Sequence, residues 1–90
     1  GVPDGSAMDC DGVLWNCRYF GGGIVRVARD GTVLDLVSLP VRNVTTCIFG
    51  GDDLKTLYIT TAANEADPAD RLAGSLFALP VAVPGLPPTR

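Results

Sequence analysis

The sequence predicts an all-β fold built from two similar units of short antiparallel strands. Three observations lead to this prediction. Short apolar segments broken by glycine, proline and aspartate recur through the 90 residues, and no segment shows a convincing helical period. Asp11-Gly12 is a strong hairpin signal, because both positions tolerate positive φ. The strand-like segments also fall into two halves that align with each other.

The first unit is expected to contain four strands that end before Pro40. Turns at Asp11-Gly12, at 21–23 and at 29–31 separate strands predicted at 6–10, 13–17, 24–28 and 32–38. Pro3-Asp4-Gly5 is expected to form a corner that leads into the first strand. Pro40 ends the fourth strand, because proline cannot donate a hydrogen bond to a β-ladder.

The second unit is expected to contain three strands and no fourth. These strands are predicted at 44–49, 56–62 and 75–79, with a turn at 50–53 between the first two. The stretch 64–73 reads as a polar loop that has room for one helical turn. Four prolines, at 80, 84, 87 and 88, are expected to prevent regular structure in the tail.

The alignment of the two units favours a β-propeller. Segment 6–8 aligns with 46–48, Leu14-Trp15 aligns with Leu57-Tyr58, and 24–27 aligns with 76–79. A repeat of about 40–50 residues with four strands per unit is typical of a propeller blade. Because a propeller needs at least about four blades, the chain is expected to be part of something longer. A sandwich of seven strands explains the strand count equally well but not the alignment.

Composition excludes several classes of protein. A hydrophobic fraction of 47% with 19% charged residues indicates a packed globular protein. The seven Lys and Arg residues are scattered and the net charge is −3, which argues against a nucleic-acid partner. No apolar run approaches the roughly 18 residues that cross a bilayer, so no membrane partner is expected. No signal peptide is recognisable, and because the first residue is glycine, the native N-terminus and any targeting signal are expected to be missing.

The cysteines indicate a reducing compartment. Cys10, Cys17 and Cys47 form an odd set without a CxxC pair, and the chain has no histidine. This pattern excludes a zinc finger or ribbon, and any mechanism with a histidine base from this chain. Three buried, reduced cysteines are the simplest interpretation, and they predict a cytoplasmic location.

Asp4 is the candidate for chemistry. In a propeller, the innermost strand of each blade lines the central channel, so a residue just before that strand lies at the channel mouth. Pro3 fixes φ on one side of Asp4 and Gly5 relaxes the backbone on the other, which lets the short carboxylate point inward. Calcium and magnesium prefer such oxygen ligands, and zinc accepts carboxylate. The alternative is an ordinary turn in which Asp4 bonds its own backbone.

The other conspicuous residues have structural interpretations. Asp9 is expected within the first strand, bonding backbone near the Asp11-Gly12 turn. Trp15 and Tyr58 are expected to pack between blades, and Cys47 to be a buried thiol at a blade interface. Two further groups could border a substrate: residues 17–19, expected on a connection, and the 64–73 loop with its acidic residues Glu65, Asp67 and Asp70. For the loop, a solvated acidic surface is the favoured interpretation.

Several motifs resemble one known family. The stretch Pro3-Asp4-Gly5, then Asp9, then Gly12-Val13-Leu14-Trp15 resembles a late-blade motif of the senescence-marker-protein, gluconolactonase and luciferin-regenerating-enzyme family, which includes regucalcin. The stretches 39–41, 44–51, 57–62 and 74–77 resemble the last blade of that family, in the expected order. The likeness spans nearly all 90 residues but only the C-terminal third of a family member.

The resemblance implies a six-bladed β-propeller with one divalent metal at the mouth of its channel. Residues 1–40 would be the penultimate blade, 41–80 the last blade without its fourth strand, and 81–90 a proline-rich tail. The missing strand and blades would come from the absent N-terminal part or from other chains. Asp4 matches a family metal ligand. The other protein ligands, a glutamate and an asparagine, lie in sequence not present here, and Glu65, Asn16, Asn43 and Asn64 do not match them.

The function implied by the resemblance is metal-dependent hydrolysis of a small sugar lactone. The metal would be calcium, zinc, magnesium or manganese, with Asp4 both binding it and helping to activate the attacking water. The fragment alone is expected to be inactive. The alternatives are a regucalcin-like regulatory propeller that binds calcium without turnover, and a non-catalytic fragment.

Overall fold

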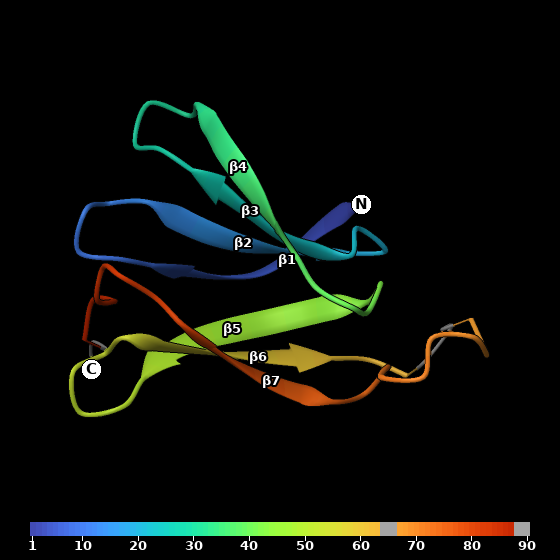
Figure 1. Cartoon of the computed structure of the whole chain (residues 1–90). Helices are drawn as coiled ribbons and strands as arrows, with labels where there is room; N and C mark the ends of the chain where they lie inside the picture. Colours follow the sequence, from blue (N-terminus) through green and yellow to red (C-terminus); the bar gives the residue numbers. More distant parts are fainter. Residues whose placement is uncertain (64–66, 88–90) are drawn as a thin grey trace.

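The computed structural model describes residues 1–63 and 67–87, which form two antiparallel sheets (Figure 1). In the first sheet the strands follow the order β1-β2-β3-β4, and in the second the order β5-β6-β7. The predicted division into four strands and three strands is confirmed. The strands are β1 (Val2–Met8), β2 (Leu14–Tyr19), β3 (Gly23–Val27), β4 (Val33–Ser38), β5 (Val44–Gly50), β6 (Thr56–Thr61) and β7 (Leu76–Pro80).

The first strand differs from the prediction at both ends. It begins at Val2, and not after the expected Pro3-Asp4-Gly5 corner, because β2 runs on to Tyr19 and pairs with Val2. The register shifts between Pro3 and Ser6, so the predicted corner is a bulge inside β1. Pro3 is tolerated there because β1 is an edge strand of its sheet. At the other end β1 stops at Met8, and the turn occupies 9–13.

The second sheet repeats the layout of the first. Its register shifts between Val44 and Thr46, close to the start of β5, as it does near the start of β1. Cys47 pairs with Ile59, whereas the equivalent Ala7 pairs with Trp15, so Trp15 corresponds to Ile59. The predicted alignment of Trp15 with Tyr58 was wrong by one residue. Because side chains alternate between the two faces of a strand, a shift of one residue moves a side chain from the buried face to the exposed face. Accordingly, Trp15 is 6% exposed and Tyr58 is 38% exposed.

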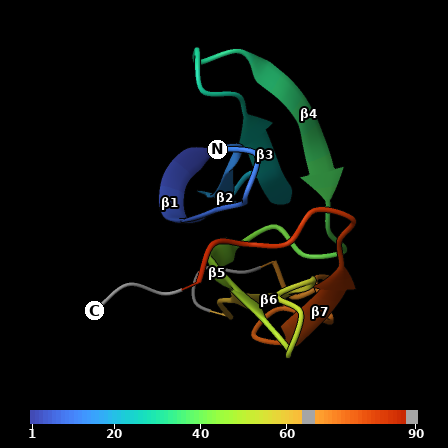
Figure 2. The ribbon, with the colours of Figure 1, turned by 90° about the vertical axis from the view of Figure 1, so that its left-hand side faces the viewer.

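The core lies between the two sheets. β1 and β5 run side by side, and β5 also contacts β2, as Figures 1 and 2 show from two directions. The ring of Trp15 meets the ring of Phe49 edge to face, with centroids 5.7 Å apart. The buried apolar residues are Trp15, Cys17, Ile24, Val41, Val44, Cys47, Phe49, Leu57 and Ile59. Each sheet therefore buries one face against the other.

The opposite faces of both sheets carry exposed apolar side chains. On the first sheet these are Met8, Val33 and Leu36, and on the second Ile48, Tyr58 and Leu76. Neighbouring exposed apolar side chains are a common feature of contact surfaces. The described residues include no helix long and apolar enough to cross a lipid bilayer.

The described part of the tail, 81–87, contains no strand but joins the two sheets. Gly85 forms an isolated bridge with Asp9, and its amide donates a 2.9 Å hydrogen bond to the carbonyl of Leu54. The amide of Cys10 donates to the carbonyl of Pro84 at 2.9 Å. Pro80 was expected to lie beyond the last strand, but it ends β7. This is possible because β7 is an edge strand. Residues 88–90 of the predicted tail lie outside the described residues.

Candidate functional site

Asp4 lies in the bulge of β1, near the end where β5 also begins. The side chain of Asn16, 8% exposed, holds the bulge in place. Its Nδ2 donates to the carbonyl of Asp4 at 3.0 Å and to Oγ of Ser6 at 2.7 Å. This positioning role was not predicted from the sequence. The available signal was the position of Asn16 among apolar residues of a strand, because a buried side-chain amide needs hydrogen-bond partners.

The carboxylate of Asp4 is exposed and free of structural bonds. Within residues 1–63 and 67–87, no group donates a hydrogen bond to it. Four other aspartates behave differently, since each accepts a hydrogen bond of 2.8–3.0 Å from the amide two residues on: Asp9, Asp30, Asp53 and Asp67. The alternative in which Asp4 bonds its own backbone in a turn is therefore not observed. The carboxylate keeps its lone pairs for another partner.

The surroundings of Asp4 come from both sheets. Gly5 touches Thr46 of β5, and a Cβ atom built on Gly5 would lie only 2.5 Å from Cβ of Thr46. Only glycine fits this close approach of the two inner strands. Beside it, Oγ1 of Thr45 lies 2.6 Å from Oγ1 of Thr60. Cys17 is near enough for the charge of Asp4 to act on its thiol.

Two buried thiols lie behind Asp4, and they were not expected to meet. Cys17 of β2 and Cys47 of β5 interact, and Sγ of Cys47 also points to the carbonyl of Trp15 at 3.6 Å. The hydrogen bond with Cys47 raises the pKa of Cys17, and burial and then the charges of Cys47 and Asp4 raise it further. The same hydrogen bond lowers the pKa of Cys47, although burial opposes this.

Asp9 has the structural role that the sequence predicted, although it lies just beyond β1. Its Oδ1 accepts hydrogen bonds from the amides of Asp11 at 2.9 Å and Val13 at 3.1 Å. Its Oδ2 accepts one from Nε1 of Trp15 at 3.0 Å. Asp9 is 1% exposed, so this carboxylate is fully used within the fold and is not a substrate ligand.

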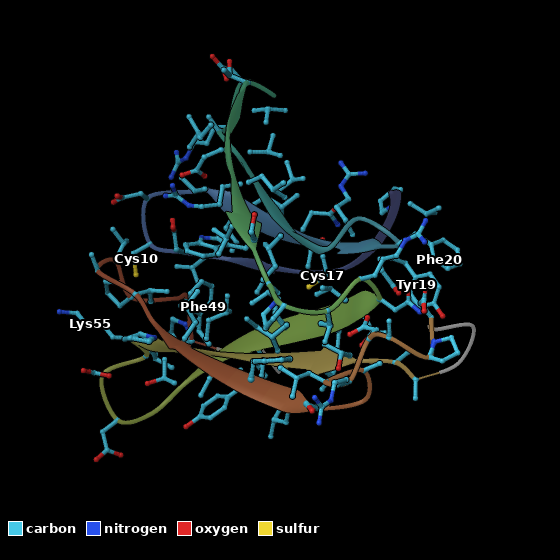
Figure 3. The ribbon with its side chains drawn as sticks, turned by 45° about the vertical axis from the view of Figure 1, so that its right-hand side comes forward. Cys10, Cys17, Tyr19, Phe20, Phe49 and Lys55 are labelled. Atoms are coloured by element: carbon cyan, nitrogen blue, oxygen red, sulfur yellow. The ribbon has the colours of Figure 1, made fainter. Side chains whose placement is uncertain are left out.

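The predictions for the aromatic residues, the cysteines and residues 17–19 have different outcomes. Trp15 is in the core between the two sheets as expected, whereas Tyr58 is 38% exposed on the outer face of the second sheet, so its packing between blades stays a prediction. Cys47 is buried between the sheets, as predicted, but Cys10 is exposed at the end of the molecule that carries Lys55 (Figure 3), so the prediction of three buried cysteines was wrong. Residues 17–19 lie within β2 and not on a connection, because their backbone pairs with β1 and β3.

The 64–73 loop is described only from Asp67 onward, so Asn64 and Glu65 lie outside the described residues. The described part contains turns, and Asp67 and Asp70 use their carboxylates on backbone amides. Oδ1 of Asp67 accepts from the amide of Ala69 at 2.8 Å, and Oδ2 of Asp70 accepts from the amide of Arg42 at 3.0 Å. The loop is therefore tied to the connection between the sheets by Asp70.

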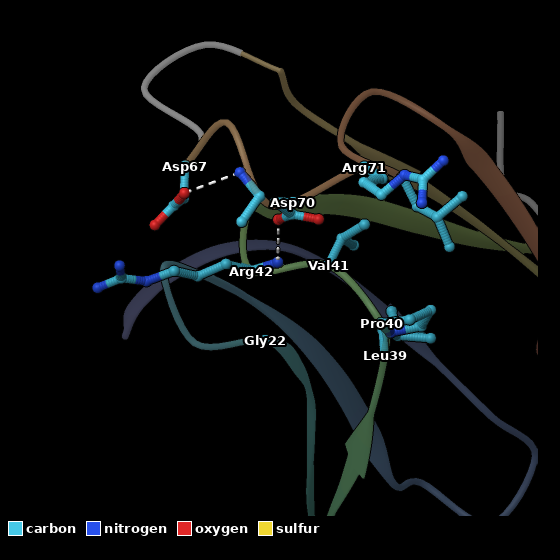
Figure 4. A pocket seen from close by; sticks show the side chains of 10 residues that line it. Gly22, Leu39, Pro40, Val41, Arg42, Asp67, Asp70 and Arg71 are labelled. Atoms are coloured by element: carbon cyan, nitrogen blue, oxygen red, sulfur yellow. Dashed lines mark hydrogen bonds between the residues drawn. The ribbon is translucent and has the colours of Figure 1, made fainter.

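An open hollow of about 890 Å³ lies between this loop and that connection (Figure 4). This hollow was not predicted from the sequence. The guanidinium of Arg42 stacks over the ring of Phe20, 5.5 Å from its centroid, and its Nε donates to the carbonyl of Phe20. Asp4 is not part of the hollow, whose lining is Gly22, Leu39, Pro40, Val41, Arg42, Asp67, Ala69, Asp70, Arg71 and Leu72.

Asp4 fits a metal site only in part. An exposed carboxylate with free oxygen atoms is the ligand that calcium and magnesium prefer, and zinc accepts it. In the part of the chain that the structure describes, no three His, Cys, Asp or Glu side chains come together in a way that could hold a cation. Among the described residues, the carboxylate of Asp4 is therefore one free oxygen donor and not a complete cation site.

Two similar sheets, side by side and each led by a bulged inner strand, define a fragment of a repetitive β protein. Residues 1–63 match the model of the SMP-30/gluconolactonase/LRE-like region. The chain belongs to this family, so the resemblance seen in the motifs is confirmed.

Several characterised proteins are similar to the chain over nearly all its length. It is 46% identical over 90 residues to 6-deoxy-6-sulfogluconolactonase from Pseudomonas putida, covering 94% of the chain and 31% of the relative. It is 40% identical over 98 residues to pentonolactonase from Haloferax volcanii, covering 100% of the chain and 34% of the relative. The chain thus spans about a third of the length of these relatives.

A solved structure of a calcium-binding protein, regucalcin, from Agrobacterium tumefaciens superposes with a TM-score of 0.86 at 31% identity. The superposition covers 93% of the chain and 30% of that protein. A luciferin-regenerating enzyme superposes with a TM-score of 0.82 at 29% identity, covering 96% of the chain and 30% of that protein. The all-β arrangement is therefore that of regucalcin-like proteins.

Proposed function

We propose that the chain is the C-terminal part of a six-bladed β-propeller that hydrolyses a sugar lactone with the help of a divalent metal. Residues 1–40 form the penultimate blade, 41–80 the last blade, and 81–90 the tail. Three observations support this placement: the repeated strand order, the bulge that both inner strands share, and the two apolar outer faces. Each outer face would pack on a neighbouring blade.

The rest of the ring comes from outside the chain. The second sheet ends at β7, whose outer edge has no strand partner among the described residues. Such an edge readily pairs with another strand. We assign this pairing to the N-terminal part of the full-length protein, or to other chains if these 90 residues act alone.

The free carboxylate of Asp4 carries the functional proposal. It lies on an inner strand, its backbone is fixed by Asn16, and its oxygen atoms take no part in the fold. The relatives from Pseudomonas putida and Haloferax volcanii are named as lactonases, which are enzymes acting on cyclic esters. A metal ligand at this position fits both the geometry and the family.

A divalent cation, when bound, would polarise the lactone carbonyl and lower the pKa of a water molecule. Asp4 would supply one ligand oxygen and accept the proton of the attacking water through the other. Asn16 and Gly5 would keep this carboxylate in place, Asn16 by hydrogen bonding and Gly5 by close contact with Thr46. The metal would be calcium, zinc, magnesium or manganese, and the expected location is the cytoplasm.

A second candidate function is calcium binding without turnover. The observation that favours it is the superposition on a protein described as calcium-binding, regucalcin. Under this function Asp4 keeps its role as a ligand, whereas lactone hydrolysis is absent. The two functions differ only in turnover, so one set of assays separates them.

The test uses the full-length protein that contains this chain. A panel of aldonolactones is hydrolysed with and without a chelator, and calcium binding is measured by calorimetry. Asp4→Ala and Asp4→Asn should lower turnover by at least about a hundredfold, as expected for the loss of a group that acts on the transition state. Asp52→Ala is the matched control, because Asp52 is an exposed aspartate on the β5–β6 turn.

Wild-type turnover in Asp4→Ala would exclude the assigned role. Calcium binding that depends on Asp4, with no hydrolysis of any lactone, would favour the regulatory function instead. The 90-residue chain alone should be inactive in the same assays.

A further inference from the structure

Thr46 lies near the start of β5, against the bulge of β1 that carries Asp4. The two strands begin at the same end of the molecule (Figure 1), and each has a register shift there. A Cβ atom built on Gly5 would overlap Oγ1 of Thr46 and would lie 2.5 Å from its Cβ atom. Because Gly5 directly follows Asp4, the side chain of Thr46 lies one residue away from the free carboxylate. Asp4 and Thr46 are both exposed, so a ligand can reach them together.

The hydroxyl of Thr46 takes no part in the hydrogen bonds of the fold. In the part of the chain that the structure describes, no group forms a hydrogen bond with it. Three neighbouring threonines behave differently. Oγ1 of Thr45 and Oγ1 of Thr60 lie 2.6 Å apart and bond each other. Oγ1 of Thr61 donates to the carbonyl of Ser75 at 2.6 Å. Of this group, Thr46 keeps its hydroxyl for another partner.

The two unused groups differ in hydrogen-bonding chemistry. An ionised carboxylate such as that of Asp4 can only accept hydrogen bonds, whereas a threonine hydroxyl can both donate and accept. A sugar hydroxyl also donates and accepts, so the hydroxyl of Thr46 is a suitable partner for it. Every aldonolactone carries such a hydroxyl on the second carbon, next to the carbonyl that is attacked. A lactone whose carbonyl is held at Asp4 would bring this hydroxyl to the neighbouring Thr46.

We propose that Thr46 determines substrate specificity, because its hydroxyl binds the hydroxyl next to the carbonyl of an aldonolactone. The proposal rests on the lactonase function proposed above, and it adds a substrate class: lactones that carry a hydroxyl on the carbon beside the carbonyl. Gly5 belongs to this arrangement, since a larger residue at that position would displace the side chain of Thr46.

The test compares two substrates of the full-length protein. One is the aldonolactone that the wild-type protein hydrolyses fastest, and the other is the 2-deoxy form of the same lactone. Thr46→Val keeps the shape of the side chain and removes the hydroxyl. It should lower kcat/KM for the aldonolactone about tenfold, as expected for the loss of one hydrogen bond. It should leave kcat/KM for the 2-deoxy lactone unchanged, because that substrate has no hydroxyl for Thr46 to bind.

Further variants separate recognition from folding and catalysis. Thr46→Ser keeps a hydroxyl and should restore the preference for the aldonolactone. Asp4→Ala should lower kcat/KM for both lactones alike, because it removes a group that acts on either carbonyl. Thr32→Val is the matched control and should change neither value, since Thr32 is an exposed threonine between β3 and β4. That connection lies at the end of the first sheet opposite to Asp4 (Figure 1).

An equal effect of Thr46→Val on the two lactones, or no effect on either, would overturn the assignment of Thr46 and leave the lactonase function standing. If Thr46→Val does not fold, the wild-type protein decides: equal kcat/KM for the aldonolactone and its 2-deoxy form would also overturn the assignment. A wild-type protein that hydrolyses no lactone would contradict the proposed function itself, and the role of Thr46 would fall with it.

Discussion

Nε1 of Trp15 donates a 3.0 Å hydrogen bond to Oδ2 of Asp9 inside the fold. Through this bond and those to two amides, Asp9 joins the β1–β2 turn to the core between the sheets. A carboxylate that is 1% exposed is stable only when such donors surround it. The turn of the first sheet and the packing of its tryptophan therefore depend on one another.

Replacement of Asp9 should destabilise the protein strongly. Asp9→Ala removes the acceptor of three hydrogen bonds and leaves the Trp15 donor without its partner, so we expect a loss of about 3 kcal/mol. Trp15→Phe, which removes only one of the three donors, should cost less than Asp9→Ala if packing is preserved. Denaturant unfolding of the full-length protein measures both losses.

Asp53→Ala is the control for Asp9→Ala, because Asp53 accepts only one exposed amide bond, from Lys55. It should cost about 0.5–1 kcal/mol. An equal cost for the Asp9 and Asp53 variants would show that the link to Trp15 contributes nothing.

The sequence predicted most of the strands because their ends are marked by local signals. Glycine and aspartate at 11–12, 30–31 and 50–53 mark turns that depend on neighbouring residues alone. The start of β1 depends instead on the pairing of Val2 with Tyr19, which is a contact between distant residues. The bulge at Asp4 follows from that pairing, so no local pattern could reveal it.

For the candidate site, the sequence pointed to a single residue, and its role as a ligand stays a prediction. The turn-like sequence Pro3-Asp4-Gly5 singled out Asp4. That the carboxylate of Asp4 accepts no hydrogen bond from the described residues, whereas the carboxylate of Asp9 accepts three, is seen only in the structure. The support from Asn16 and the meeting of Cys17 with Cys47 both need the packing of two strands. Such relationships depend on the tertiary fold, which a strand pattern does not specify.

The carboxylate of Asp30 gives a test at acid pH. The hydroxyl of Thr32 and then its amide, at 2.9 Å from Oδ1, hold the pKa of Asp30 below its ordinary 3.8. Because the pKa of Asp30 is lower in the folded protein than in the unfolded chain, the Asp30 carboxylate stabilises the fold above its ordinary pKa. This stabilisation is lost as the pH falls through the lowered pKa. Thr32→Val should move the pKa of Asp30 upward, because it removes the hydroxyl. NMR titration of the Asp30 carboxyl checks this, and a wild-type value at or above 3.8 would contradict the hydrogen-bonded turn.

The outer faces of the two sheets predict how the isolated 90-residue chain behaves. Ile48 is 58% exposed and Leu76 is 67% exposed on one outer face, and Val33 is 64% exposed on the other. Water-exposed apolar faces and the open edge of β7 favour association, since pairing between chains buries both. Because each chain supplies two sheets, three copies would supply the six blades of the proposed ring. Sedimentation of the chain alone should therefore show a multimer, with a species of three chains if a ring closes.

The double variant Ile48→Glu with Leu76→Glu should shift the multimer toward the monomer, because charge on that face opposes burial. Lys55→Glu is the control, since it changes a charge on the β5–β6 turn away from both faces. A wild-type chain that stays monomeric at every concentration would show that these faces do not seek partners.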